Sequence, residues 1–399
     1  MDVNDDDYGF SMLAQNESTL DIVIDRFFNW SARLPIDAAM FSLINNMPLL
    51  IIINSLLLIC IFTSFYIINK SIFRIEHGIK IFTMLVISIT LIPVYIANDS
   101  ILWVTGSFNY LWPAAFFLIG MVRFFIKKRS YLISIVCIAS SCFSVYSEQI
   151  IVISIFIFPL LFIYKNKTSS ICSTDIIQVL LMISNIAIQV LSPANEIRFN
   201  AEVLRGFNDF FDKSIFEKIS IGVIMSIDYI FNKYNTLYIT LAIIISHLLF
   251  INKTNYHKTL SLLISLPPIL SFLFKMSPDF ISPTNVLSIK NNALILIGLF
   301  SISLVSYSLF IISIKHKLLL PFLFMLSILI IIAIGFAPTT YVERPRVYFF
   351  TCIIILYIIY TLFLITKKLA TSNTFYFLSC ICLSLGVAQY VVYQIINIV

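Results

Sequence analysis

The chain has 399 residues, of which 60% are apolar and 12% are charged, and it carries a formal net charge of +6. Its mean hydropathy of +0.98 excludes a protein whose whole surface faces water, because soluble domains are nearer half apolar and a quarter charged. The apolar residues form runs of roughly twenty, long enough to cross a bilayer as helices. We therefore expect an all-α, multi-pass membrane protein, a single domain over residues 1–399 with about 10–13 transmembrane helices.

Apolar runs bounded by charged residues predict about twelve spans. In chain order they lie near 40–68, 81–97, 110–126, 131–146, 150–164, 174–192, 234–251, 259–274, 293–314, 318–336, 347–366 and 374–398. The runs around 131–164 are short, and the run at 219–251 is interrupted by polar residues at 232–235. Such runs are also compatible with re-entrant segments that do not cross.

The loops between these runs alternate in charge. One set is short and basic, and its only acidic residues are Glu76 and Asp175; its basic residues are Lys70, Arg74, Lys80, Lys127, Lys128, Arg129, Lys165, Lys167, Lys253, Lys258, Lys315, Lys317, Lys367 and Lys368. The positive-inside rule assigns this set to the cytoplasm. The acidic tail at 1–37 and the loop at 193–218 then lie on the outer side. The basic charge is spread over membrane-flanking loops, so no nucleic-acid partner is expected.

The N-terminal tail opens with acidic residues and lacks the basic stretch and apolar core of a signal peptide. Either this short tail is translocated directly, or the natural start lies upstream. Residues 19–32 predict a helix lying in the outer membrane interface, with Trp30 at headgroup level. Its apolar face would be formed by Leu20, Val23, Ile24, Phe27 and Phe28.

Polar, Gly or Pro residues interrupt the apolar pattern in six segments, and all six map to the outer side. They are NDDDY from Asn4, NWSARLP from Asn29, WVTGSFNYLWP from Trp103, SEQ from Ser147, SPANEIRF from Ser192 and PTTYVERPR from Pro338. The cytoplasmic loops are short, rich in lysine and too short to build a site. Any chemistry is therefore expected at the outer face.

Several common kinds of site are absent from the sequence. The seven cysteines form no CxxC pair and predict neither a disulfide framework nor a metal site. The four histidines lie in or near the cytoplasmic loops, so an outer-face reaction has no histidine base. No P-loop, GxGxxG or GxSxG motif occurs, which argues against ATP-driven transport and serine hydrolysis.

Charged residues of the outer segments are the candidates for chemistry. Glu148 lies between two apolar runs, where a carboxylate is costly unless it has a function or pairs with an arginine. Arginines 198, 344 and 346 are outer-face cations whose planar fork suits phosphate oxygens, although each could simply neutralise a loop acid. The Asp5-Asp6-Asp7 run is either a solvated end or a source of a catalytic carboxylate.

Two tryptophans flank a segment that Gly106, Asn109 and Pro113 should break. Trp103 and Trp112 are placed as aromatic-belt residues by default. Non-helical backbone at this depth survives when it is packed in protein or lines a wet cavity, so the two indoles could instead stack on a sugar ring.

Taken together, these motifs resemble the serotype-converting O-antigen glucosyltransferases (Gtr type) of enterobacteria and their phages. The resemblance rests on Asp6-Asp7-Tyr8, the W-x-x-R of Trp30 to Arg33, the WVTGSFNYLWP loop, the SEQ glutamate, the PANEIR segment and the ERPR segment. It covers about the first 200 residues and residues 338–346. The sequence departs from the family pattern in lacking an initial helix and in having Ala194 where the family has glycine.

The resemblance implies a GT-C-like glycosyltransferase of the bacterial inner membrane, with its active site facing the periplasm. It would transfer a sugar, glucose in similar proteins, from an undecaprenyl-phosphate donor to the O-antigen. Asn109, Tyr110, Asn195 and Arg33, with Trp103 and Trp112, would then bind the sugar or the acceptor.

Residue chemistry agrees with this reading. Without a histidine, a carboxylate is the natural general base; Asp6 or Asp7 is the first candidate and Glu148 the second. Arg198, with Arg344 or Arg346, would meet the charge of the departing phosphate. Direct displacement would invert the anomeric centre. The scheme requires no cofactor, although the acidic run could hold a divalent metal.

Two other functions compete with this one. An O-antigen polymerase is also a polytopic outer-face enzyme, but it should have larger outer loops than 193–218. A lipid-linked oligosaccharide flippase or other transporter predicts two similar halves and polar residues at mid-membrane, and neither feature is seen in the sequence. Sugar identity, linkage and oligomeric state are left open.

Overall fold

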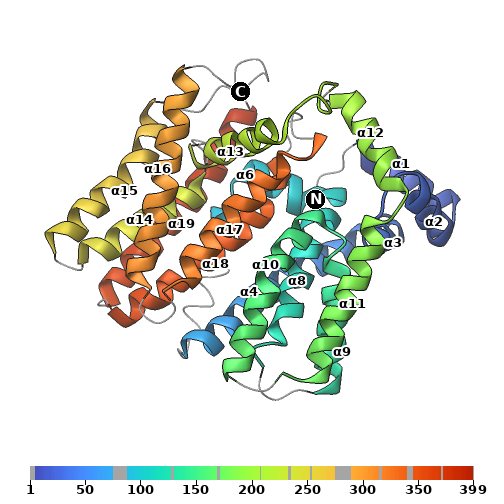
Figure 1. Cartoon of the computed structure of the whole chain (residues 1–399), viewed down its shortest axis with the longest axis horizontal. Coiled ribbons are helices and arrows are strands. Elements are labelled where there is room, and N and C mark those ends of the chain that lie inside the picture. The colour runs from blue at the N-terminus through green and yellow to red at the C-terminus, as the bar shows by residue number, and fades with distance from the viewer. Residues whose placement is uncertain are drawn as a thin grey trace. The chain divides into compact units, whose positions relative to one another are not determined.

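The computed structural model describes residues 5–74, 88–126, 130–168, 171–206, 208–231, 235–251, 254–274, 289–313, 317–338, 345–369 and 372–398. These residues are helical and include no strand, as the apolar periodicity predicts. The chain divides into two compact units (Figure 1). Unit 1 comprises Met1–His77, Ala97–Phe211 and Tyr341–Arg346, and unit 2 comprises Gly78–Ile96, Asp212–Thr340 and Val347–Val399.

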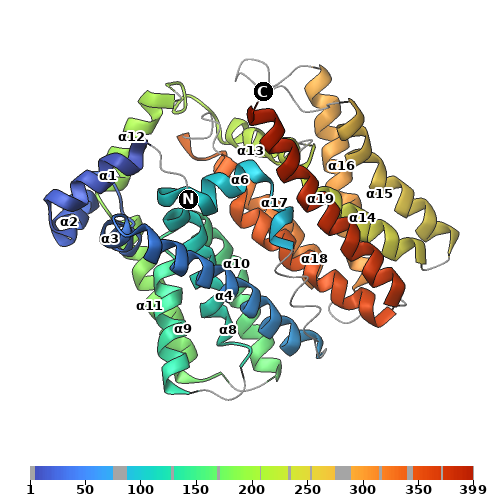
Figure 2. The same cartoon turned by 180° about the vertical axis from the view of Figure 1, so that it is seen from behind.

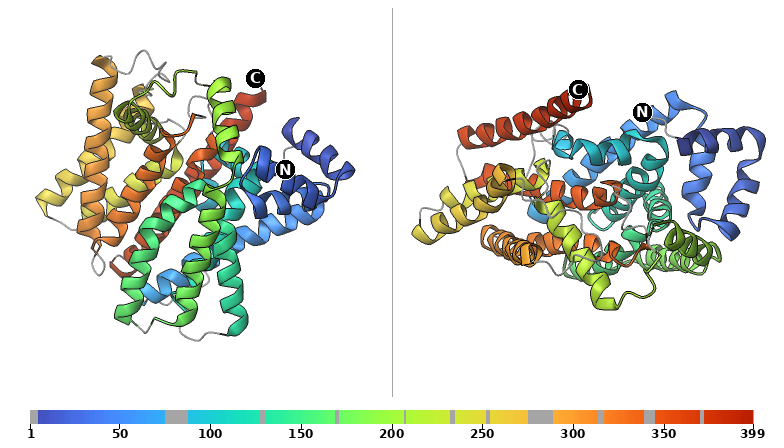
Figure 3. Two further views of the ribbon diagram at one scale, coloured as in Figure 1. Left: turned by 45° about the vertical axis from the view of Figure 1, so that its right-hand side comes forward. Right: turned by 90° about the horizontal axis from the view of Figure 1, so that it is seen from above.

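Unit 1 begins with three short helices that lie together, α1 (Asp5–Asn16), α2 (Thr19–Asn29) and α3 (Leu34–Leu43) (Figure 3). Ser18 begins α2 by accepting a hydrogen bond from the backbone N–H of Asp21 at 3.2 Å. The predicted helix over 19–32 is therefore present. Its apolar residues divide between two faces: Ile22 and Val23 pack inward, whereas a stripe at i, i+4 and i+8 is exposed, formed by Leu20, Ile24 and Phe28.

The longer helices of unit 1 run side by side (Figure 1). They are α4 (Met47–Phe73), α8 (Trp112–Val122), α9 (Tyr131–Ser144), α10 (Glu148–Thr168) and α11 (Ser173–Val190). Each begins within seven residues of a predicted span. The expected outer loop at 193–218 is largely helical in unit 1, because α12 (Ala194–Gly206) fills its first half and packs against α2.

Between α4 and α8 the chain forms a broken helix, here called the broken segment (residues 98–112). A π-helical turn, η2 (Asn98–Leu102), is followed by the short helix α7 (Val104–Gly106) and a second π-helical turn, η3 (Ser107–Leu111). Gly106 is required by packing: a Cβ there would stand 2.7 Å from Cε3 of Trp103 and would overlap the backbone carbonyl of Asp99. The expected break near residues 103–113 is thus present, as irregular turns rather than an open loop.

Unit 2 is built around long apolar helices, with the C-terminal helix in front in Figure 2. Its elements include η1 (Ile89–Leu91), α13 (Ile215–Phe231), α14 (Thr236–Ile251), α15 (Asn255–Phe274), α16 (Ile289–Ile312), α17 (Leu319–Ile334), α18 (Phe349–Leu369) and α19 (Ser372–Ile398). The short elements α6 (Val94–Ala97) and η6 (Pro345–Tyr348) lie where the chain changes unit. Helix α18 packs against α14, α17 and α19.

The apolar helices lie where spans were expected, but fewer of them than expected are long enough to cross a membrane. Among the described residues, five helices are long and apolar enough to cross a membrane, and a sixth is added if α13 and α14 form one broken span. The five are Met47–Phe73, Glu148–Thr168, Ser173–Val190, Ile295–Ile312 and Pro345–Ile365. Others, such as α9 with 14 residues, are apolar but shorter than a crossing helix. The described helices therefore support five or six full-length spans and not the expected 10–13.

Unit 2 contains a helix break at which three backbone carbonyl groups accept hydrogen bonds from side chains. Pro93 ends the η1 turn because it has no backbone N–H. Gln389 of α19 donates to the carbonyls of Thr90 and, at 3.0 Å, Ile92, while Thr236 of α14 donates to that of Leu91 at 2.7 Å. Within an apolar helix bundle such pairing is required, because no water replaces a lost backbone hydrogen bond.

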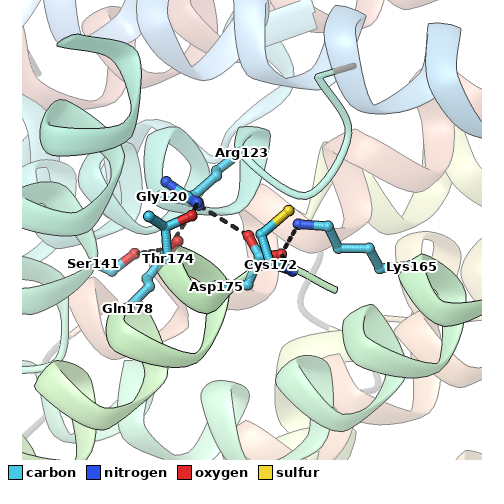
Figure 4. A network of polar contacts seen from close by, with 8 residues as sticks. All are labelled: Gly120, Arg123, Ser141, Lys165, Cys172, Thr174, Asp175 and Gln178. Atoms are coloured by element: carbon cyan, nitrogen blue, oxygen red, sulfur yellow. Dashed lines mark hydrogen bonds and ion pairs between the residues drawn. The ribbon is translucent and has the colours of Figure 1, made fainter. Parts of the chain in front are cut away.

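The end of α8 far from the broken segment is held by a buried charge network (Figure 4). Arg123 Nε donates to Asp175 Oδ1 at 3.1 Å, and Lys165 donates to Asp175 Oδ2. Cys172 adds its backbone N–H to Oδ2 at 2.9 Å. All three charged side chains are at most 1% exposed. Asp175, in the first turn of α11, therefore binds both Lys165 of α10 and Arg123 at the end of α8.

Neutral groups extend this network toward α9 (Figure 4). The side-chain amide of Gln178 donates to the carbonyl of Gly120 at 3.0 Å and to Ser141 Oγ at 2.6 Å. Gly120 allows this close approach, because a Cβ there would overlap the Ser141 hydroxyl. Four helices, α8 to α11, are thus joined by side chains, and α8 is fixed as a rigid support for the broken segment.

Candidate functional site

Helix α1 places Asp7 against the broken segment of unit 1. One carboxylate oxygen of Asp7, Oδ1, accepts the backbone N–H of Thr105 at 3.1 Å and also the Thr105 hydroxyl. The Asp7 side chain is 1% exposed, whereas its neighbour Asp6 is exposed. Consecutive helical residues point about 100° apart, so the acidic run cannot act as one cluster. The structure therefore separates the two carboxylates that the sequence leaves equivalent.

Arg33 connects three parts of unit 1 that are distant in sequence. It precedes α3, and its two terminal nitrogens diverge to different partners. Nη1 donates to Asn109 Oδ1 at 2.6 Å, and Nη2 donates to both carboxylate oxygens of Glu148 at 3.0 and 2.8 Å. Asn109 is oriented for this by donating its own amide to the carbonyl of Thr105 at 2.8 Å. Glu148 therefore forms an ion pair with an arginine, one of its two expected roles.

Arg198 of α12 adds a second positive charge beside this ion pair. The pKa of Arg198 is lowered, first by the charge of Arg33 and then by burial, while Glu148 and Glu202 act in the opposite direction. Arg198 makes no hydrogen bond to any described residue. Glu202, one helical turn further along α12, is buried, and its Oε2 has no hydrogen-bond partner among the described residues. Arg198 thus lies within electrostatic range of Arg33, Glu148 and Glu202.

Arg346, in η6, lies against Trp103, the first tryptophan of the broken segment. Its guanidinium carbon stands 4.5 Å from the ring centroid of Trp103, a cation–π contact. Asp99 is close enough to act on Arg346 electrostatically; burial raises the pKa of the Asp99 carboxyl, and Arg346 opposes that change. Trp103 itself is only 6% exposed. With Gly106 against one part of its ring and Arg346 over it, this indole leaves little room for sugar stacking.

Two other residues expected to bind sugar have structural partners. Trp112 is 6% exposed and donates its indole N–H to Asn54 Oδ1 at 2.8 Å, in a cluster with Phe108 and Phe143. Asn195 donates its amide to the carbonyls of Gln189 and Val190 at 2.6 and 3.1 Å, closing the end of α11. These contacts favour packing and capping roles.

The broken segment brings together most of the expected site residues. Asp7, Arg33, Glu148 and Arg346 approach it from α1, α3, α10 and η6, and Asn109, Tyr110 and Trp103 belong to it. Tyr110 lies close enough to act electrostatically on Arg33 and Arg198. Arg344 lies outside the described residues. The sequence did not single out Thr105, Asp99 or Glu202, because a polar residue inside a helix gives no signal until its neighbours are known.

No group of three or more His, Cys, Asp or Glu side chains that could hold a metal ion occurs in the part of the chain that the structure describes. Comparison with known proteins adds no identification: no protein-family model, curated protein or solved structure matches this chain.

Proposed function

We propose that this chain is a membrane glycosyltransferase that moves a sugar from a polyprenyl-phosphate donor to an O-antigen acceptor at the outer face of the bacterial inner membrane. The observation that carries the proposal is the convergence on the broken segment. An oriented carboxylate, Asp7, and three guanidinium groups, those of Arg33, Arg198 and Arg346, come from four distant parts of the chain. A carboxylate base and cations for a phosphate leaving group are what such a transfer requires.

The donor follows from the location. Nucleotide sugars are cytoplasmic, so an outer-face transferase needs a sugar carried by a lipid, which can enter sideways between helices. The acceptor hydroxyl oxygen attacks the anomeric carbon while the bond from that carbon to the phosphate oxygen breaks. The hydroxyl proton passes to the carboxylate base, and the phosphate leaves with the bonding electron pair. Attack opposite the leaving group inverts the anomeric centre.

The geometry favours Asp7 over Glu148 as the base. Glu148 accepts two charge-assisted hydrogen bonds from Arg33, which stabilise its ionised form and make it a poor proton acceptor. Asp7 also accepts two hydrogen bonds, but from the neutral backbone N–H and hydroxyl of Thr105, which orient the carboxylate and stabilise its ionised form less than an arginine does. Because Asp7 is 1% exposed, its reaction with an acceptor requires neighbouring side chains to move while the bonds to Thr105 stay in place. Glu148, 59% exposed, is instead available to hydroxyl groups of a sugar.

A transfer assay in liposomes tests the proposal, with radiolabelled glucosyl polyprenyl phosphate, purified O-antigen and no nucleotide sugar. Labelled polysaccharide is expected with the wild-type chain. Asp7→Asn should lose about 10²–10⁴-fold in rate, the usual contribution of a general base. Asp6→Asn is the matched control, since its carboxylate is exposed and is expected to leave the rate within about threefold.

The outcomes separate the competing functions. Equal loss in both variants would assign the acidic run a role in folding rather than proton transfer. Absence of transfer by folded wild-type protein with several sugar donors would overturn the proposal. In that case diphosphate-linked glycan, the donor of a polymerase, and then lipid-linked oligosaccharide transport would be assayed next.

A further inference from the structure

The indole N–H of Trp103 is the clearest unsatisfied donor beside the candidate site. Trp103 is 6% exposed, and its Nε1 has no hydrogen-bond partner among the described residues. A buried donor without an acceptor is costly, so such a group calls for an explanation, and a bound acceptor is one. The equivalent donor of Trp112, by contrast, is paired with Asn54.

Arg346 provides more donors at the same place. It makes no hydrogen bond or ion pair within 4 Å to any described residue, and the ring of Trp103 holds its guanidinium at 4.5 Å. A cation–π contact positions an arginine without using its N–H groups, so the five donors of the fork remain available. The face of the Trp103 ring thus contacts a cation, and its edge carries a buried donor without a partner among the described residues.

Donors of this kind call for an acceptor with several oxygens and a negative charge. Arg346 supplies the charge and a planar fork, which matches two phosphate oxygens, and Trp103 supplies a single donor suited to a third. Asp99 does not fill this place, because it forms no ion pair with Arg346 within 4 Å. A sugar ring cannot fill it by stacking, since the indole is covered by Arg346 and by Gly106.

We propose that Trp103 Nε1 and the Arg346 guanidinium together bind a phosphate group, which in the reaction proposed above is the phosphate of the lipid donor. The proposal rests on that reaction for the identity of the lipid, but the phosphate chemistry comes from the two donors alone. It gives Trp103 a role as a hydrogen-bond donor in place of the expected role as a sugar-stacking platform.

The test uses the full chain in nanodiscs and measures binding of sugar-free polyprenyl phosphate by calorimetry. Trp103→Phe keeps an aromatic ring for Arg346 and removes the N–H. It is expected to weaken binding about 10-fold or more, the loss of one hydrogen bond to a charged group. Arg346→Lys keeps the charge, removes the fork and should weaken binding by a similar factor. Trp30→Phe, a change at an exposed tryptophan, is the matched control and should bind as the wild type does.

A second titration with inorganic phosphate distinguishes the source of the anion. Displacement of the lipid by inorganic phosphate, sensitive to both variants, would assign the site to the phosphate alone. Lipid binding that inorganic phosphate does not displace, but that both variants weaken, would assign it to a lipid phosphate. Unchanged affinity of Trp103→Phe for both ligands overturns the proposal.

Failure of the phosphate site and failure of the proposed sugar transfer would give different results. Wild-type donor KM in Trp103→Phe with normal transfer would overturn the phosphate site and leave the transferase intact. Binding of inorganic phosphate that depends on Trp103 and Arg346, in a chain that transfers no sugar, would support the site and refute the proposed reaction.

Discussion

Replacement of Asp175 by Asn is expected to destabilise the helix bundle of unit 1 more than any exposed substitution. The carboxylate accepts from Arg123, Lys165 and the N–H of Cys172, and it is fully buried. Asparagine has nearly the same shape but no charge, so two buried cations would lose their shared counter-ion. Removal of one partner from a buried ion pair typically costs about 3–5 kcal/mol.

The measurement is a denaturant titration of the purified chain in mixed micelles, followed by the loss of helical structure. Asp21→Asn is the control, because Asp21 is an exposed carboxylate whose described side-chain contact is the Ser18 hydroxyl at 2.6 Å. Its change in unfolding free energy should stay below about 1 kcal/mol. Raising the salt concentration should leave the loss in Asp175→Asn nearly unchanged, since buried charges are poorly screened.

A double-mutant cycle isolates the charge effect. Lys165→Met combined with Asp175→Asn removes one cation together with the anion, so the double variant should be more stable than additive losses predict, by about 0.5–3 kcal/mol. The reasoning is refuted if Asp175→Asn lies within about 0.5 kcal/mol of the wild type, or if the two losses simply add.

Three further predictions concern other parts of the chain. Gly106→Ala should abolish transfer in the liposome assay while leaving membrane insertion intact, because the new Cβ would overlap the carbonyl of Asp99 and displace Trp103; wild-type activity would refute the packing argument. Arg33→Lys should lower activity about 10-fold or more, because a single ammonium cannot hold Asn109 and Glu148 at once as the two terminal nitrogens of Arg33 do, and Glu148→Gln should not add fully to it; additive losses would indicate independent roles. Gln389→Leu should lower stability by about 1–3 kcal/mol per unpaired carbonyl, measured by the same denaturant titration, and no change would show that the carbonyls find other donors.

Positions of helices could be predicted from the sequence much better than the geometry of the site. Hydropathy marks where α4, α10 and α11 lie because each is apolar over at least 18 residues. It does not show that two π-helical turns follow residue 98, since such turns depend on tertiary packing, which at Gly106 leaves no room for a Cβ. The broken segment was therefore expected as a break but not in this form.

Individual candidate residues could be chosen from the sequence, but their pairing could not be predicted. Glu148 is an unusual acid in an apolar context, and Arg33 lies in a polar motif. Their ion pair spans 115 positions and depends on the register between α3 and α10. The contrast between Asp6 and Asp7 likewise depends on which face of α1 meets Thr105. The Arg33–Glu148 ion pair and the contact of Asp7 with Thr105 both depend on tertiary packing, which local sequence patterns do not predict.

The carbonyl groups before Pro93 bear on how the chain is made. Gln389, the donor to the carbonyls of Thr90 and Ile92, lies 297 positions after Ile92. At a translation rate of about 5–20 residues per second, roughly 15–60 s pass between synthesis of the two residues. During that interval the acceptors must be shielded by water, by the insertion machinery or by temporary partners in the membrane. Arrival of α19 thus comes long after synthesis of Ile92, and a ribosome stalled within α19 should leave a protease-sensitive form of unit 2.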